Sequence, residues 1–147
     1  MASAALTKVL IIDDDVRVTD MLKETLSHES FEVFVANSGA EGIKATQQLT
    51  PEVIVLDLIM PGVSGWQVCR AIRIFSQVPI LVLSAVVDHE LVMQALDEGA
   101  NDYIVKPVST SILASRLRRL TQQARISQSG EPRDEGDDAP APSFPSW

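Results

Sequence analysis

Several residues that suit metal and phosphate chemistry stand at the ends of apolar segments of strand length. These residues are Asp13, Asp14, Asp57, Ser84 and Lys106. Neighbouring carboxylates repel one another and lose hydration when they are partly buried, so a cation is needed to offset that cost. Carboxylates are hard oxygen ligands of the kind that Mg²⁺ prefers. We therefore expect a magnesium site formed by Asp13, Asp14 and Asp57.

Asp57 is the candidate nucleophile for phosphoryl transfer. A carboxylate can attack a phosphoryl group and form an acyl phosphate, and catalysis then consists mainly of positioning and charge neutralisation. Mg²⁺ commonly completes its coordination with phosphate oxygen, and Lys106 and Ser84 are suited to bind the other phosphoryl oxygens. The segment after Asp57, "LIMPGVSG", contains one proline and two glycines that let the backbone pass close to such a site.

The elements that must position these residues alternate between strands and helices. Strands are predicted at 8–12, 31–36, 52–57, 79–85 and 102–106. The first, third and fourth are almost continuous in Val, Ile and Leu, as in a parallel sheet that is covered on both faces. Short loops and right-handed crossovers then predict an α/β fold, a flavodoxin-like doubly wound sheet of five parallel strands in the order 2-1-3-4-5 with five helices. Ligands of such sheets bind beyond the carboxyl ends of the strands.

Apolar residues at helical spacing predict the helices between the strands. The helix over 39–48 is the weakest, and the last runs from about 109 to 123. Asp15 is expected to cap the helix that begins at residue 16. The expected stripes are Val18, Met21, Leu22 and Leu26; Val68, Cys69, Ile72 and Phe75; Leu91, Val92, Ala95 and Leu96; and Ile112, Leu113, Leu117 and Leu120.

The composition changes near the C-terminus and sets the expected domain boundary. Residues 125–147 are rich in Pro, Gly, Ser and acidic side chains without a hydrophobic period. Such a composition buries too little apolar surface to become ordered. We expect a single domain over 7–124, followed by a disordered acidic and proline-rich tail or linker.

The overall charge and the cysteine content narrow the class of protein. The 147 residues carry a formal net charge of -8, which disfavours direct binding to nucleic acid or to an anionic membrane. The single cysteine excludes an intrachain disulfide framework and suits a reducing compartment. The sequence contains neither a signal peptide pattern nor an apolar run of membrane-spanning length, so the expected location is cytoplasmic.

Taken together, these motifs resemble the receiver domain of bacterial two-component response regulators over residues 7 to about 124. The resemblance rests on the acidic pair Asp13-Asp14, on "VLDLIMPGVSGWQV" around Asp57, on "LSA" at 83–85 and on "GANDYIVKP" at 99–107. It implies a phosphorylation-dependent switch, not an enzyme with a separate substrate. A histidine kinase or phosphotransfer protein would donate the phosphoryl group to Asp57 with Mg²⁺ present. Asp14, Asp57 and the main-chain carbonyl of Ile59 would bind the metal, with Asp13 acting through water.

The resemblance also implies how the signal leaves the site. Lys106 would pair with one phosphoryl oxygen, and Ser84 would donate a hydrogen bond to another. Movement of Ser84 would be coupled to an inward turn of Tyr103, which would remodel the face made by the fourth helix, the fifth strand and the fifth helix. That face would contact a downstream protein or output domain. The peptide bond between Lys106 and Pro107 resembles the cis bond of the family, which only X-Pro bonds form cheaply.

Other functions remain as alternatives. The chain could be the receiver fragment of a longer DNA-binding transcriptional regulator, and a phosphorylation-dependent homodimer involving Asp102 and Arg116 stays open. An aspartyl-phosphate phosphohydrolase usually has a second aspartate two residues after its nucleophile, where Ile59 stands. A flavin-binding electron carrier would need a phosphate-binding loop after the first strand. The acidic run Asp13-Asp14-Asp15 stands there and would repel that phosphate. The apolar residues Ile59 and Val86 predict a longer-lived phosphorylated form than in relatives with polar groups there.

Overall fold

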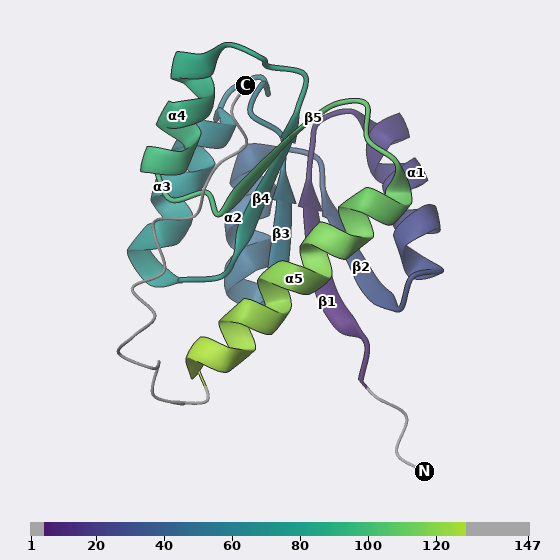
Figure 1. Cartoon of the computed structure of the whole chain (residues 1–147). Coiled ribbons are helices and arrows are strands. Elements are labelled where there is room, and N and C mark those ends of the chain that lie inside the picture. Colours follow the sequence, from purple (N-terminus) through teal and green to yellow (C-terminus); the bar gives the residue numbers. More distant parts are fainter. Residues whose placement is uncertain (1–4, 129–147) are drawn as a thin grey trace.

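The computed structural model describes residues 5–128, which form one layered α/β domain (Figure 1). Strands and helices alternate along the chain as the sequence predicts. The strands are β1 (Thr7–Ile12), β2 (Phe31–Ala36), β3 (Val53–Leu56), β4 (Ile80–Ser84) and β5 (Asp102–Val105). The helices are α1 (Val16–Ser27), α2 (Gly39–Leu49), α3 (Gly65–Phe75), α4 (His89–Asp97) and α5 (Thr110–Gln128).

The five strands form one parallel sheet in the order β2-β1-β3-β4-β5, so the predicted topology is confirmed. The register places Ile12 of β1 opposite Ala36 of β2 and Leu56 of β3. Ser84 of β4 lies opposite Val105 of β5. The carboxyl ends of the strands therefore meet along one edge of the sheet, and the loops that follow β1, β3, β4 and β5 leave from that edge.

Helices cover both faces of the sheet, as Figure 1 shows, and each strand contributes to two hydrophobic cores. Val9 and Ile11 of β1 pack on the side of α1 and α5. Leu10 and Ile12 of the same strand pack on the side of α2, α3 and α4. Because successive side chains of a strand point to opposite faces, a strand buried on both sides must be apolar throughout. This explains the nearly continuous Val, Ile and Leu runs.

Polar side chains define where four of the helices begin. The Asp15 carboxylate accepts a hydrogen bond from the Arg17 amide, which confirms the predicted cap of α1. Ser38 and Asp88 cap α2 and α4 in the same way. Ser64 forms a capping box with Gln67 at the start of α3. These caps fix the chain immediately after the loops that carry the polar residues.

The buried face of each helix includes fewer residues than the spacing of apolar residues predicts. Met21, Phe75, Leu91 and Ile112 were expected to face the core, but their side chains are exposed. Each helix rests on only one face of the sheet, so a residue at the border of its apolar stripe points into solvent. In α1 the buried positions are Thr19, Leu22 and Leu26.

The last helix is longer than the sequence predicts. α5 continues to Gln128, so residues 125–128, which the sequence places in the tail, are helical. A last helical turn that faces solvent can consist of polar residues, so the change in composition does not mark the end of the helix. The remainder of the predicted tail lies outside the described residues. Within residues 5–128, no helix has both the length and the apolar character needed to cross a membrane.

Candidate phosphoacceptor and metal site

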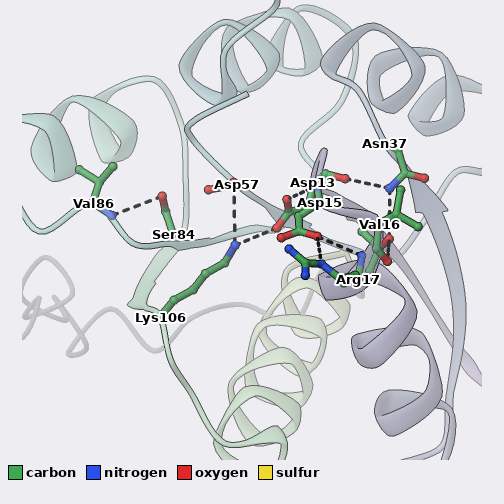
Figure 2. A network of polar contacts seen from close by, with 10 residues as sticks. Asp13, Asp15, Val16, Arg17, Asn37, Asp57, Ser84, Val86 and Lys106 are labelled. Carbon is green, nitrogen blue, oxygen red and sulfur yellow. Dashed lines mark hydrogen bonds and ion pairs between the residues drawn. The ribbon is translucent and has the colours of Figure 1, made fainter. Parts of the chain in front are cut away.

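The structure brings the predicted polar residues together at the carboxyl edge of the sheet. Asp13 directly follows β1, Asp57 directly follows β3, Ser84 ends β4, and Lys106 directly follows β5. Figure 2 shows the Lys106 side chain reaching across from β5 toward Asp13 and Asp57. Strands from four parts of the sequence thus supply one site, as the switch-point rule for open α/β sheets predicts.

Lys106 makes its closest ionic contact with Asp13. Its ammonium nitrogen lies 2.8 Å from Oδ2 of Asp13 and 3.9 Å from Oδ2 of Asp57. Asp13 is only 4 % exposed, and its Oδ1 also accepts a hydrogen bond from the Asp15 amide at 3.0 Å. A buried carboxylate needs such partners to remain charged. Lys106 therefore satisfies the more buried carboxylate of the site.

Asp57 is held by the backbone on a closely packed turn. Its amide donates to the Ile12 carbonyl at 3.0 Å, and a Cβ atom on Gly65 would lie only 2.3 Å from the Asp57 carbonyl oxygen. Gly65 thus permits the close approach of α3 that the sequence predicts from its glycines. The main chain leaves Asp57 little freedom, so its carboxylate is presented at a defined place.

The electrostatic surroundings of Asp57 act in opposite directions. Burial raises its pKa above the ordinary value of 3.8, because the charged form loses hydration. The Lys106 ammonium opposes that effect, whereas the negative charge of Asp13 adds to it. Like the Lys106 ammonium, a hydrogen bond from Ser84 lowers the pKa of Asp57. The balance leaves Asp57 a more basic carboxylate than one in water.

Asp13, Asp14 and Asp57 form a cluster that suits a divalent cation. Each can offer one carboxylate oxygen, and these oxygens all lie within 4.8 Å of one another. Asp14 is exposed, whereas Asp13 and Asp57 are buried. Among residues 5–128, the ion pairs of these three carboxylates involve one ammonium, that of Lys106, which leaves two negative charges to be balanced. The charge and the oxygen donors both fit Mg²⁺.

Ser84 and Tyr103 lie next to this cluster and share one neighbour. The Val86 amide donates to Oγ of Ser84 at 3.5 Å, and the Tyr103 hydroxyl donates to the Val86 carbonyl at 2.6 Å. The Tyr103 ring is turned inward and is only 4 % exposed. The Lys106 amide donates to the Ser84 carbonyl at 2.9 Å. Val86 in the loop after β4 therefore connects Ser84 to Tyr103, and the Ser84 carbonyl connects the end of β4 to Lys106.

One further predicted feature is present in the structure, because the Lys106-Pro107 peptide bond is cis. Arg116 of α5 pairs with Asp102 of β5 within the same chain, at 2.8 Å and 2.9 Å, a contact that the sequence does not predict. Their role in a homodimer stays a prediction. The role of Ile59 as a carbonyl ligand stays a prediction, and its side chain is exposed.

Two residues near the site, Asn37 and Thr19, are not among those that the sequence predicts there. The Asn37 amide group donates to the Asp13 carbonyl at 3.0 Å and to Oγ1 of Thr19 at 3.1 Å. Asn37 directly follows β2, so a search for polar residues at every strand end would have found it. Thr19 occupies an apolar helix position, and only its burial in the structure reveals it.

Comparisons with known proteins agree with this arrangement. The family profile described as "Response regulator receiver domain" matches residues 9–118. The DNA-binding response regulator MtrA of Mycobacterium tuberculosis strain H37Rv is 39% identical over 111 residues, which cover 76% of this chain and 49% of MtrA. The transcriptional regulatory protein AfsQ1 of Streptomyces coelicolor is 38% identical over 115 residues, 78% of this chain and 51% of AfsQ1. The chain thus spans about half the length of these curated relatives.

A solved structure supports the same relationship. The chemotaxis protein CheY4 of Vibrio cholerae superposes with a TM-score of 0.75 and 32% identity, covering 79% of this chain and 99% of CheY4. Because the family profile matches most of the chain and the strand order and fold agree, the chain belongs to the response regulator receiver domain family.

Proposed function

We propose that this chain is a phosphorylation-activated switch of a two-component system, with Asp57 as the phosphoacceptor. A histidine kinase or a phosphotransfer protein donates the phosphoryl group. The observation that carries this proposal is the position of the Asp57 carboxylate, which clusters with the acidic pair Asp13-Asp14 and lies 3.9 Å from the ammonium of Lys106. Membership of the receiver domain family supports it.

The transfer step uses the basic carboxylate of Asp57. One carboxylate oxygen attacks the phosphorus atom of a phosphohistidine, and a P–O bond forms while the P–N bond breaks. The electron pair of the broken bond stays on the imidazole nitrogen, which then takes up a proton. Lys106 turns from Asp13 to an oxygen of the transferring group, since its nitrogen already lies 3.9 Å from Asp57. Ser84 donates to another of these oxygens.

The acidic cluster is proposed as the magnesium site of this reaction. Asp13, Asp14, Asp57 and the Ile59 carbonyl would hold the ion, with Asp13 acting through water. A bound Mg²⁺ neutralises charge on the phosphoryl oxygens. The protein's own contribution is to bring the three carboxylates within 4.8 Å despite their mutual repulsion. The chain accepts a phosphoryl group and does not act on a separate substrate.

Ser84 and Tyr103 are proposed as the switch that reports phosphorylation. Ser84 moves toward the phosphoryl group, and the shared contact at Val86 transmits that movement to Tyr103. Tyr103 lies on β5, so the change reaches the surface formed by α4, β5 and α5. That surface is the proposed contact for a downstream protein or output domain. The expected compartment is the cytoplasm, in agreement with the single, buried cysteine.

A second candidate function is supported by the relatives. MtrA is named a DNA-binding response regulator, and this chain matches about half of it. The chain would then be the receiver part of a longer transcriptional regulator, with DNA contacts made elsewhere. A dimer that forms on phosphorylation favours this candidate, whereas a chain that stays monomeric favours a stand-alone switch. Size-exclusion chromatography with light scattering, before and after phosphorylation, distinguishes the two.

Phosphorylation by acetyl phosphate tests the main proposal. Wild type, Asp57→Ala and the control Asp97→Ala, which removes an exposed carboxylate from α4, are incubated with acetyl phosphate and Mg²⁺. Intact-mass spectrometry should find one phosphoryl group on wild type and on Asp97→Ala, and none on Asp57→Ala. Equal incorporation by Asp57→Ala, or no incorporation by wild type, would contradict the assignment.

A further inference from the structure

The turn that carries the acidic pair is anchored at its first residue. The Asp13 amide donates to the Ala36 carbonyl at 3.1 Å, which extends the pairing of β1 with β2. The Asp13 carbonyl accepts from Nδ2 of Asn37 at 3.0 Å. That carbonyl belongs to the peptide plane that joins Asp13 to Asp14. The Asn37 amide therefore restrains the rotation of the peptide plane from which Asp14 projects.

The second donor of the Asn37 amide group is also used. It donates to Oγ1 of Thr19 at 3.1 Å, and Oγ1 of Thr19 donates in turn to the Val16 carbonyl at 3.1 Å. Thr19 is 0% exposed and lies in the first turns of α1. In Figure 2, Asn37 points from the end of β2 toward Asp13. Asn37 thus ties the acidic turn to a buried hydroxyl on the helix that follows it.

The charge of the Asn37 side chain matters for a metal site. Repulsion among Asp13, Asp14 and Asp57 acts to open the turn between β1 and α1. A lysine or arginine donor at position 37 would hold the turn but would compete with a cation for the carboxylates. A neutral amide holds the same carbonyl without adding positive charge. The side chain therefore resists the repulsion and leaves the carboxylate oxygens available.

We propose that Asn37, anchored by Thr19, is a positioning residue for the acidic cluster and keeps Asp14 oriented for Mg²⁺. This inference rests on the proposed function, because it gives the cluster its role as a magnesium site. Asn37 itself contacts no reacting atom. It acts through the Asp13-Asp14 peptide, as residues behind metal ligands commonly do.

Variants of these two residues, each with a matched control, test the inference. Asn37→Ala removes both hydrogen bonds that the side chain donates. Thr19→Val removes the hydroxyl at nearly constant shape, and Thr19→Ser retains it. The control is Asn101→Ala, because Oδ1 of Asn101 accepts two hydrogen bonds, from the Ile80 amide and from Arg73, each at 2.9 Å. Asn101 directly precedes β5 and bonds to Ile80 at the start of β4, at the opposite edge of the sheet from the acidic cluster.

Magnesium affinity, measured by isothermal titration calorimetry on the full chain, is the first readout. Asn37→Ala should weaken Mg²⁺ binding by about tenfold, the range found for residues behind metal ligands. Thr19→Val should weaken it by a smaller factor, and Thr19→Ser should restore it to about the wild-type value. Asn101→Ala should lower the unfolding temperature without changing the affinity. An Asn37→Ala affinity equal to that of wild type would overturn the inference.

Amide hydrogen exchange without Mg²⁺ is the second readout, and it separates this inference from the proposed function. Asn37→Ala should accelerate exchange at residues 13–16, whereas Asn101→Ala should not. A wild-type chain that binds no Mg²⁺, together with faster exchange in Asn37→Ala, contradicts the proposed metal site and retains Asn37 as the residue that holds the acidic turn. Unchanged exchange at residues 13–16 overturns the inference whatever the affinity for Mg²⁺.

Discussion

The ammonium of Lys106 contacts Asp13 at 2.8 Å, although the two residues stand 93 positions apart in the chain. This ion pair joins the end of β5 to the end of β1 across the intervening strands β3 and β4. It also keeps a positive charge at the acidic cluster, where a metal ion would compete with it. The position of Lys106 therefore affects both metal binding and phosphoryl transfer.

Lys106→Met is expected to change these two properties in opposite directions. Removal of the ammonium should tighten Mg²⁺ binding by about tenfold, because the cation no longer meets a like charge at the carboxylates. Phosphorylation by acetyl phosphate should slow by about a hundredfold, because one group that stabilises the transferring oxygens is lost. Calorimetry and intact-mass kinetics measure the two effects. The control Lys44→Met removes an exposed lysine from α2 and should change neither the Mg²⁺ affinity nor the phosphorylation rate. Weaker Mg²⁺ binding in Lys106→Met would contradict the competition between Lys106 and the metal ion.

Asp57→Asn is expected to raise the unfolding temperature by a few degrees in the absence of Mg²⁺. Because burial raises the Asp57 pKa, the folded state binds the Asp57 proton more tightly than the unfolded state. Its stabilising contribution is complete below the ordinary pKa of 3.8 and is lost as the pH rises through the raised value. The increase in unfolding temperature caused by Asp57→Asn should therefore be present at pH 7 and should disappear below about pH 3.8.

Thermal unfolding followed by circular dichroism, at a series of pH values in EDTA, measures this gain. Asp97→Asn is the control, since Asp97 is an exposed carboxylate on α4. It should leave the unfolding temperature nearly unchanged. A lower unfolding temperature for Asp57→Asn than for wild type at pH 7 would contradict the electrostatic account.

Phosphorylated Asp57 is expected to hydrolyse slowly. Ile59 is 58% exposed and Val86 is half-buried, and neither side chain can orient a water molecule for attack on the phosphoryl group. Ile59→Asn supplies a polar group at this exposed position and should shorten the lifetime severalfold. Loss of the phosphorylated mass after removal of acetyl phosphate measures it. A wild-type lifetime of seconds, or no change in Ile59→Asn, would show that these positions do not control hydrolysis.

Tyr103→Phe is expected to separate phosphorylation from signalling. Loss of the hydrogen bond to the Val86 carbonyl should reduce the free energy of unfolding by about 1 kcal/mol, measured by urea denaturation. The phosphorylation rate should stay near that of wild type, because the Tyr103 hydroxyl donates to the Val86 carbonyl, which takes no part in the proposed transfer. The change in amide hydrogen exchange that phosphorylation causes in α4 and β5 should become smaller. An unchanged exchange response would remove Tyr103 from the proposed switch.

Cys69 is expected to be unreactive in the folded protein. Burial raises the pKa of its thiol to about 11, and its side chain is fully buried on α3. At pH 8 only about one thiol in a thousand would be ionised, and the thiolate is the reactive form. A chromogenic disulfide reagent should therefore react far more slowly with the native chain than with the chain in urea. Equal rates would show that α3 opens readily.

The sequence was sufficient for the architecture because burial on both faces of a parallel sheet leaves a visible pattern. Strands with continuous Val, Ile and Leu, separated by helical periods, identify the doubly wound sheet, for which the flavodoxin-like strand order is the preferred interpretation. The same topology brings the ends of β1, β3, β4 and β5 to one edge. Asp13, Asp57 and Lys106 could thus be placed together before any side-chain geometry was known.

Only the tertiary structure decided which groups contact one another. It pairs Lys106 more closely with Asp13 than with Asp57, and it reveals the hydrogen bonds that Asn37 donates. It also shows that the Met21 side chain is exposed, although the helical pattern predicts its burial. A sequence pattern assigns a residue to a strand end or a helix face, but contacts between distant residues depend on how the elements pack. Those contacts hold the acidic cluster together.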